Sequence, residues 1–145
     1  YVRHELVYEW FVKQAERFAI TKIAYDPAKA FELVKALTAY GFEMKPVRQG
    51  FVTLGPALDH LQELFLDGAV VYNNNRLLRW YINNVKLVED RNRNKMPTKI
   101  GKYRRIDGFA ALLNAHTEVM HMLTTPSPGG SIEFVSISKL LKGGE

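Results

Sequence analysis

Segments with the periodicity of a helix alternate with short strand-like segments along the first half of this chain. In the helix-like segments apolar residues recur at helical spacing, whereas the strand-like segments are short and rich in β-forming residues. This alternation restricts the chain to the α/β class, in which helices cover a sheet with parallel pairing. The predicted order is a helix over about residues 4–19, a strand over 20–25, a helix that begins at Asp26-Pro27 and ends at Gly41, a strand over 42–47 and a helix over about 52–66.

The second half of the chain is less regular. Three consecutive asparagines predict a turn that caps a short helix. The few strand patterns are thin for this much helix, so we expect further strands upstream of residue 1. The predicted elements are a brief strand over 69–72, a short helix that runs through Tyr81, a strand over 85–88, a loop over 89–102 and a last helix that begins at Asp107.

The length of 145 residues and the hydrophobic content of 47% fit one globular domain with a core of its own. Cysteine is absent, which excludes disulfides and thiolate-bound zinc. No apolar run approaches the roughly 20 residues of a membrane-spanning helix, so we expect no membrane partner. We expect one domain over residues 1–125, followed by a linker and tail over 126–145.

Positive charge is concentrated in one stretch, residues 86–107. Its eight bases and three acids sum to +5, which equals the net charge of the whole chain, so the remainder sums to zero. A localised positive surface attracts phosphates by displacing their condensed counterions. A solvated loop without a partner is the alternative interpretation. The bases are Lys86, Arg91, Arg93, Lys95, Lys99, Lys102, Arg104 and Arg105.

Two aspartates occupy the ends of predicted elements. Asp26 follows the first predicted strand, and Asp107 begins the last helix directly after the basic stretch. Each could cap a helix, because aspartate at a helix start accepts a hydrogen bond from an exposed backbone N–H. Each could equally hold a divalent metal, since carboxylates from separate elements suit Mg²⁺ and Mn²⁺. The local pattern leaves both alternatives open.

An ordered set of motifs over roughly residues 5–125 resembles the large terminase subunit of tailed bacteriophages. The order of the motifs is more specific than any one of them. The motifs are Asp26-Pro27 at a strand end, Gln49-Gly50 after the next strand, the run Asn75-Arg76-Leu77-Leu78-Arg79-Trp80, Asn84-Val85, Pro97-Thr98-Lys99, and Ile106-Asp107-Gly108 followed by a helix rich in alanine and leucine.

The resemblance implies the C-terminal nuclease domain of that subunit, an RNase H-like mixed sheet flanked by helices, here truncated at the N-terminus. Such a domain is a metal-dependent endonuclease that cuts concatemeric double-stranded DNA by two-metal phosphodiester hydrolysis. Asp26 and Asp107 match the second and third of the family's three catalytic acids, which hold two Mg²⁺ or Mn²⁺ ions. The first acid has no counterpart here, so we expect the 145-residue chain to be a weak or inactive nuclease.

DNA contacts and partners are predicted from the same resemblance and from the charge pattern. Lys99 matches the family's pattern and would neutralise a DNA phosphate. The expected partners are double-stranded DNA, the terminase ATPase domain, the small terminase subunit and the portal. The expected place of action is the cytoplasm of the bacterial host. The other predicted DNA-binding residues are Lys102, Arg104, Arg105, Arg79 and Asn84.

Two other functions fit the sequence. A non-catalytic module that binds DNA, or docks on the motor or portal, would carry the same basic stretch, and another RNase H-like nuclease, such as a junction resolvase, would share the fold. Trp80 is predicted to pack in the core rather than stack on bases. Asn84 either contacts the active site or DNA or satisfies backbone groups at a turn. His116 and His121 are about 140° apart around a helix, which excludes them as joint metal ligands, and His60 has no partner at metal-binding spacing.

Overall fold

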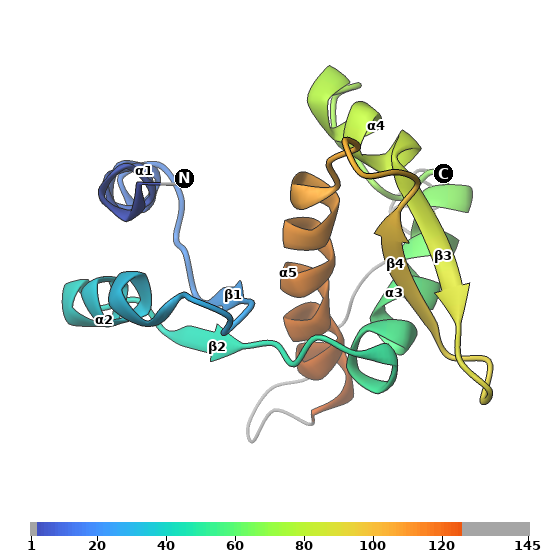
Figure 1. Ribbon diagram of the computed structural model, residues 1–145. Helices are drawn as coiled ribbons and strands as arrows, with labels where there is room; N and C mark the ends of the chain where they lie inside the picture. The colour runs from blue at the N-terminus through green and yellow to red at the C-terminus, as the bar shows by residue number, and fades with distance from the viewer. Residues whose placement is uncertain (1–2, 126–145) are drawn as a thin grey trace, which may run out of the picture.

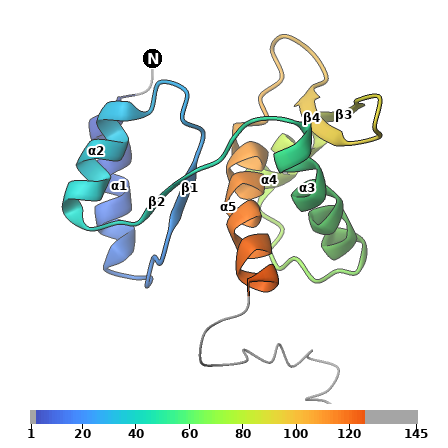
Figure 2. The same ribbon diagram turned by 90° about the horizontal axis from the view of Figure 1, so that it is seen from below.

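The computed structural model describes residues 3–125, so the predicted tail over 126–145 lies outside the described part. Residues 4–46, with two strands and two helices, lie beside a second group of helices and strands (Figures 1 and 2). No helix between residues 3 and 125 combines the length and apolar character that a membrane crossing requires. The elements are α1 (His4–Ala15), β1 (Ile23–Tyr25), α2 (Phe31–Tyr40), β2 (Met44–Pro46), α3 (Phe51–Leu66), α4 (Arg76–Asn83), β3 (Val85–Glu89), β4 (Lys95–Lys99) and α5 (Asp107–Thr124).

The first part of the fold is a parallel pair of strands that packs with α1 and α2. Ile23, Leu37 and Phe42 are buried together at its centre, and apolar side chains of α1 pack around them. Gly41 ends α2 in the left-handed conformation with φ of 117°, which glycine adopts without strain. The register of β1 and β2 pairs Ile23 with Met44, Ala24 with Lys45 and Tyr25 with Pro46.

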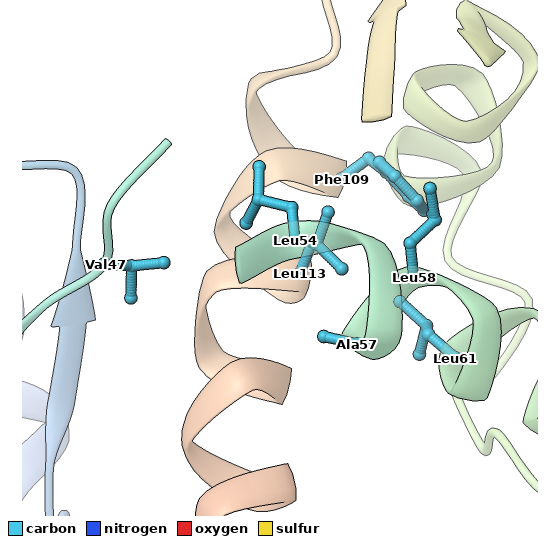
Figure 3. Packing of buried hydrophobic residues seen from close by; sticks show 7 residues of the cluster. All are labelled: Val47, Leu54, Ala57, Leu58, Leu61, Phe109 and Leu113. Carbon is cyan, nitrogen blue, oxygen red and sulfur yellow. The ribbon is translucent and has the colours of Figure 1, made fainter. Parts of the chain in front are cut away.

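The second part is built on the contact between α3 and α5. Figure 3 shows Leu54, Leu58, Phe109 and Leu113 in the space between these helices. Burial of each such side chain stabilises the fold by about 1.5–3 kcal/mol relative to exposure. The antiparallel hairpin of β3 and β4 packs on α3 through β4. The buried cluster consists of Val47, Leu54, Ala57, Leu58, Leu61, Phe109 and Leu113.

The α/β class predicted from the alternation is confirmed, and the described strands form two sheets of two strands each, one parallel and one antiparallel. Two predictions for the second half of the chain are wrong. Residues 69–72 form no strand, and residues 95–99, predicted as loop, form β4. Pro97 suggested a loop, but among the described strands β4 pairs only with β3. Proline is tolerated on such an edge strand, because its missing N–H need not bond a neighbour.

Asp90 closes the hairpin between β3 and β4. Its carboxylate accepts hydrogen bonds from the side chain of Asn94 at 2.9 Å and from the backbone N–H groups of Asn94 at 2.9 Å and Asn92 at 2.8 Å. These bonds, above all the one from the Asn94 side chain, lower the pKa of the Asp90 carboxyl. The turn between β3 and β4 is therefore held by an acid that lies within the basic stretch.

Candidate functional site

Asp26 directly follows β1 and is exposed to solvent. Its Oδ1 accepts a hydrogen bond from the backbone N–H of Ala28 at 2.9 Å, which stabilises the turn after the strand. Helix α2 begins only at Phe31, with Ala30 as N-cap, so the prediction that Asp26-Pro27 begins this helix is wrong. A carboxylate offers about four lone-pair sites, so one local hydrogen bond leaves Asp26 able to bind a cation.

Asp107 is the first residue of α5 and is exposed. Ile106 occupies the N-cap position, so the alternative in which Asp107 caps the helix is wrong. A carboxylate in the first turn is still favoured by the positive end of the helix dipole. The next residue, Gly108, packs so closely on Tyr81 that a Cβ built there would overlap the tyrosine ring. This contact fixes the start of α5 against α4.

Strand β1 lies against α5 and runs in the opposite direction. Before the strand, the Lys22 ammonium lies 3.8 Å from the carboxylate of Glu118, in the second half of α5. Further along, Ala24 lines the same groove as Ala111, which is nearer the start of α5. Figure 2 shows that β1 ends and α5 begins at the same end of the molecule. Strand β1, which Asp26 follows, therefore ends on the side of the domain where α5, which starts with Asp107, begins.

The basic stretch occupies the β3–β4 hairpin and the loop that leads from β4 into α5. Lys95 is used within the fold, because its ammonium pairs with the Asp59 carboxylate of α3 at 3.1 Å. The loop ends at the first residue of α5, so its positive charge borders the end of the molecule that carries the two aspartates. Its exposed bases, together with the last residue of β4, are Lys99, Lys102, Arg104 and Arg105.

Asn84 follows α4 and is buried, with 3% of its surface exposed. Its backbone carbonyl accepts a hydrogen bond from the N–H of Ile100 at 3.0 Å. Its side-chain amide donates a hydrogen bond to the carbonyl of Arg105 at 2.9 Å. These contacts match the alternative in which Asn84 satisfies backbone groups at a turn. Asn84 holds both ends of the loop that carries the basic side chains.

Helix α4 begins after Asn75, whose side chain accepts a hydrogen bond from the N–H of Leu78 at 3.0 Å, as the asparagine turn predicts. Arg79 is exposed on this helix. Trp80 is 40% exposed, so the prediction that it packs in the core is wrong. Tyr81 packs against the buried cluster instead. Consecutive helical residues point about 100° apart, so only one of two adjacent rings can face the core.

Residues 4–122 match the family model described as terminase large subunit, endonuclease domain. This chain belongs to that family. The large terminase subunit of Enterobacteria phage HK97 is 32% identical over 97 residues, which is 66% of this chain and 19% of that protein. The crystal structure of the HK97 bacteriophage large terminase is similar to this fold, with a TM-score of 0.72 and 27% identity. The match covers 81% of this chain and 25% of that one.

The family inferred from the ordered motifs is thus confirmed for this terminase endonuclease domain, and the matched range contains every one of those motifs. The chain spans about a fifth to a quarter of the length of the relatives it matches.

One polar pair of the terminase endonuclease domain was not predicted from the sequence. His60 of α3 and His116 of α5 stack with their ring centroids 5.0 Å apart, and Nδ1 of His60 lies 2.9 Å from Nε2 of His116. Burial lowers the pKa of His116, and the neighbouring His60 lowers it further. The two residues are 56 positions apart, so no spacing rule could have found the pair.

The donor set for a metal ion is small in the described part of the chain. Residues 3–125 contain no group of three or more His, Cys, Asp or Glu side chains that could hold an ion. The two aspartates supply hard oxygen ligands, which suit Mg²⁺ and Mn²⁺. Mg²⁺ is commonly held by one or two protein carboxylates, with water and substrate phosphates as its other ligands. Asp26 and Asp107 therefore fit such an ion chemically when a phosphate completes its shell.

Proposed function

We propose that this domain is the metal-dependent endonuclease of a DNA-packaging terminase, and that it cuts concatemeric double-stranded DNA by two-metal phosphodiester hydrolysis. The observation that carries the proposal is the arrangement of β1 and α5, which end and begin on one side of the domain with an exposed aspartate each. Membership of an endonuclease family supports the reaction class.

Asp26 and Asp107 are the proposed catalytic metal ligands. Two Mg²⁺ or Mn²⁺ ions bound there would activate the attacking water and stabilise charge on the leaving 3′ oxygen. The aspartates would orient the ions against the DNA phosphate, which itself supplies oxygen ligands. Two carboxylates hold two ions less well than the family's three acids would, so we propose that the 145-residue chain alone is a poor nuclease.

The proposed DNA surface is the set of exposed bases beside the aspartates. These side chains would neutralise phosphates, a type of contact that carries no sequence information, so little sequence preference is expected. Asn84 would support the surface indirectly, because it holds the loop at both ends. The proposed DNA-binding residues are Lys99, Lys102, Arg104 and Arg105 of the basic stretch and Arg79 of α4.

The proposed setting is the cytoplasm of the bacterial host. There the domain would act beside the terminase ATPase domain, the small terminase subunit and the portal, partners that we infer from the family alone.

The test replaces each aspartate by asparagine, which keeps the side-chain shape and removes its charge. Asp26→Asn and Asp107→Asn should each bind Mn²⁺ more weakly, measured from the electron paramagnetic resonance signal of free Mn²⁺. Nicking of supercoiled plasmid is measured in a longer form of the chain that includes the family's first acid, because the 145-residue chain alone is expected to cut poorly. There each substitution should lower the rate by roughly 100-fold or more, since metal stabilisation of the transition state contributes several kcal/mol. Asp67→Asn, at the exposed end of α3, is the matched control.

Loss of Mn²⁺ binding and nicking in both variants, with an unchanged control and unchanged circular dichroism, would support the proposal. Nicking that survives both substitutions would remove the catalytic role of the two aspartates. DNA binding without metal-dependent nicking in the longer form would favour the second candidate, a non-catalytic DNA-binding or docking module. This second candidate is favoured by one observation: residues 3–125 contain no group of three or more His, Cys, Asp or Glu side chains that could hold a metal ion.

A further inference from the structure

The loop between β4 and α5 presents one aromatic side chain at the tip of a tight turn. The N–H of Arg104 donates a hydrogen bond to the carbonyl of Gly101 at 3.0 Å. This bond closes a four-residue turn with Lys102 and Tyr103 at its two central positions. Both central side chains are exposed. The turn leads within four residues to Asp107, a proposed metal ligand.

The loop is held at its base by a single buried residue. Asn84 bonds Ile100 at the beginning of the loop and Arg105 at its end. Figure 2 shows the segment between β4 and α5 as an arch that extends beyond the beginning of α5. A loop fixed in this way loses less conformational entropy on binding than a mobile one. The tip is therefore presented to a ligand in a defined position.

The chemistry of the tip favours a nucleic acid over a protein. The Tyr103 side chain is 85% exposed, and the Lys102 ammonium lies 5.8 Å from its ring centroid. Arg104 and Arg105 follow directly in the sequence. A protein partner would be expected to meet a contiguous apolar patch, whereas this ring is set among cations. Aromatic rings within a basic surface stack on nucleobases while the neighbouring cations contact phosphates.

We propose that Tyr103 stacks on a nucleobase next to the cleavage site, so that the domain binds DNA with unstacked bases more tightly than intact duplex. This inference rests on the proposed function, because it needs DNA at the end of the domain that carries Asp107. In intact duplex the faces of the bases are covered by their neighbours. Tyr103 therefore reaches a base only where the duplex is bulged, mismatched or frayed, and this locally unstacked DNA is the substrate class that the tip selects.

The experiment measures binding by fluorescence anisotropy in EDTA, so that neither metal nor cleavage contributes. Two labelled duplexes of one sequence are compared, one fully paired and one with a bulge of unpaired adenines. The wild-type chain should bind the bulged duplex about 5- to 100-fold more tightly, the range expected for one base stacked on an aromatic ring. Tyr103→Ala should bind both duplexes equally. Tyr103→Phe should keep the preference, because the ring carries it.

The matched control is Phe31→Ala, which removes a 75% exposed aromatic ring from α2, an element outside the basic stretch. This variant should keep the wild-type preference. As a second readout, 2-aminopurine in the bulge should change its fluorescence with the wild-type chain and Tyr103→Phe, and not with Tyr103→Ala. The unfolding midpoint of each variant should equal that of the wild type, because position 103 is at an exposed tip.

Equal affinities of the wild-type chain for the two duplexes, or a preference that survives Tyr103→Ala, would overturn the inference. A preference lost in Tyr103→Phe would assign it to the hydroxyl and overturn stacking. Neither result would affect the proposed function, which is judged by the Mn²⁺ binding and nicking of the aspartate variants. Absence of binding to either duplex in EDTA would also overturn the inference, whereas the proposed function would still be judged by Mn²⁺ binding and nicking.

Discussion

At Gly108 the fold depends on the absence of a side chain. The ring of Tyr81 occupies the space that a Cβ on this glycine would need, and the same ring packs against the buried cluster. Asp107, the neighbour of Gly108, is not the cap of its helix. Its position is set by the contact between α4 and α5, so a residue that carries no chemistry controls one that we propose to be catalytic.

Gly108→Ala should lower the free energy of unfolding by about 1–3 kcal/mol, because the added methyl group overpacks the contact with Tyr81. This cost should appear even though alanine favours a helix by about 1 kcal/mol relative to glycine. Urea unfolding measures the change. Gly101→Ala is the control, since a Cβ there meets nothing within 4 Å. Tyr81→Leu in the Gly108→Ala background should recover part of the loss, and an unchanged stability of Gly108→Ala would contradict the contact.

Single residues show how far local pattern predicts a site. The sequence located Asp26 and Asp107 correctly at the ends of elements, because a strand end and a helix start are local features. It could not give the late start of α2 at Phe31, which depends on the conformation of the turn before it. It also left two alternatives for Asn84, since one bonding partner, Arg105, is 21 positions away.

Among the elements, the helices were the most predictable and strand β4 was the least. Periodic apolar residues located α1, α2, α3 and α5, because each buries one face against the rest of the protein. β1 and β2 are three residues long, shorter than their patterns, yet their parallel pairing follows from the helix between them. β4 was missed because it is polar, contains Pro97 and is stabilised by pairing with β3 across the hairpin rather than by an apolar pattern of its own.

The His60–His116 pair between α3 and α5 should make the stability of the domain depend on pH. The pKa of His116 is lowered in the folded protein by burial and by His60, whereas in the unfolded chain it is about 6.5. Below about pH 6.5 the unfolded chain therefore takes up a proton before the folded protein does. Stability should be fully present above that pH and fall as the pH drops toward the lowered pKa of the folded state.

The measurement is the free energy of unfolding in urea from pH 7.5 down to about 5. His116→Gln should give a flatter profile than the wild type over this interval, with a lower stability at pH 7 because the buried pair is lost. His121→Gln is the control, because His121 is exposed on the same helix. A profile for His116→Gln as steep as that of the wild type would show that another group causes the pH dependence.

At the scale of the whole molecule, the charge distribution should dominate the binding of intact duplex. Lys99→Glu, Lys102→Glu and Arg104→Glu together change the net charge from +5 to −1, since each reversal subtracts two. Each lost phosphate contact removes about 0.9 units from the slope of log K against log salt. We expect the triple variant to bind duplex DNA of any sequence more weakly than the wild type does. The slope of log K against log salt should be flatter by roughly 2–3 units.

A second triple variant separates position from net charge. Lys13→Glu, Arg17→Glu and Lys35→Glu change three exposed bases in or near α1 and α2 and give the same net charge of −1. This variant should keep most of the wild-type slope in a salt titration followed by anisotropy. Equal losses in the two triple variants would mean that the basic stretch attracts DNA only through the overall charge of the molecule.

The buried side chains form two clusters, one in each part of the fold. Asp26 follows the strand of Ile23, which belongs to the first cluster, and Asp107 precedes Phe109 of the second. The distance between the two carboxylates therefore depends on how the first part of the fold packs on the second, at the contact between β1 and α5. The binding of ions shared by the two aspartates would be thermodynamically linked to the stability of this contact between β1 and α5. A substitution there would weaken metal binding from a distance, and bound metal would in return raise the temperature at which the two parts separate.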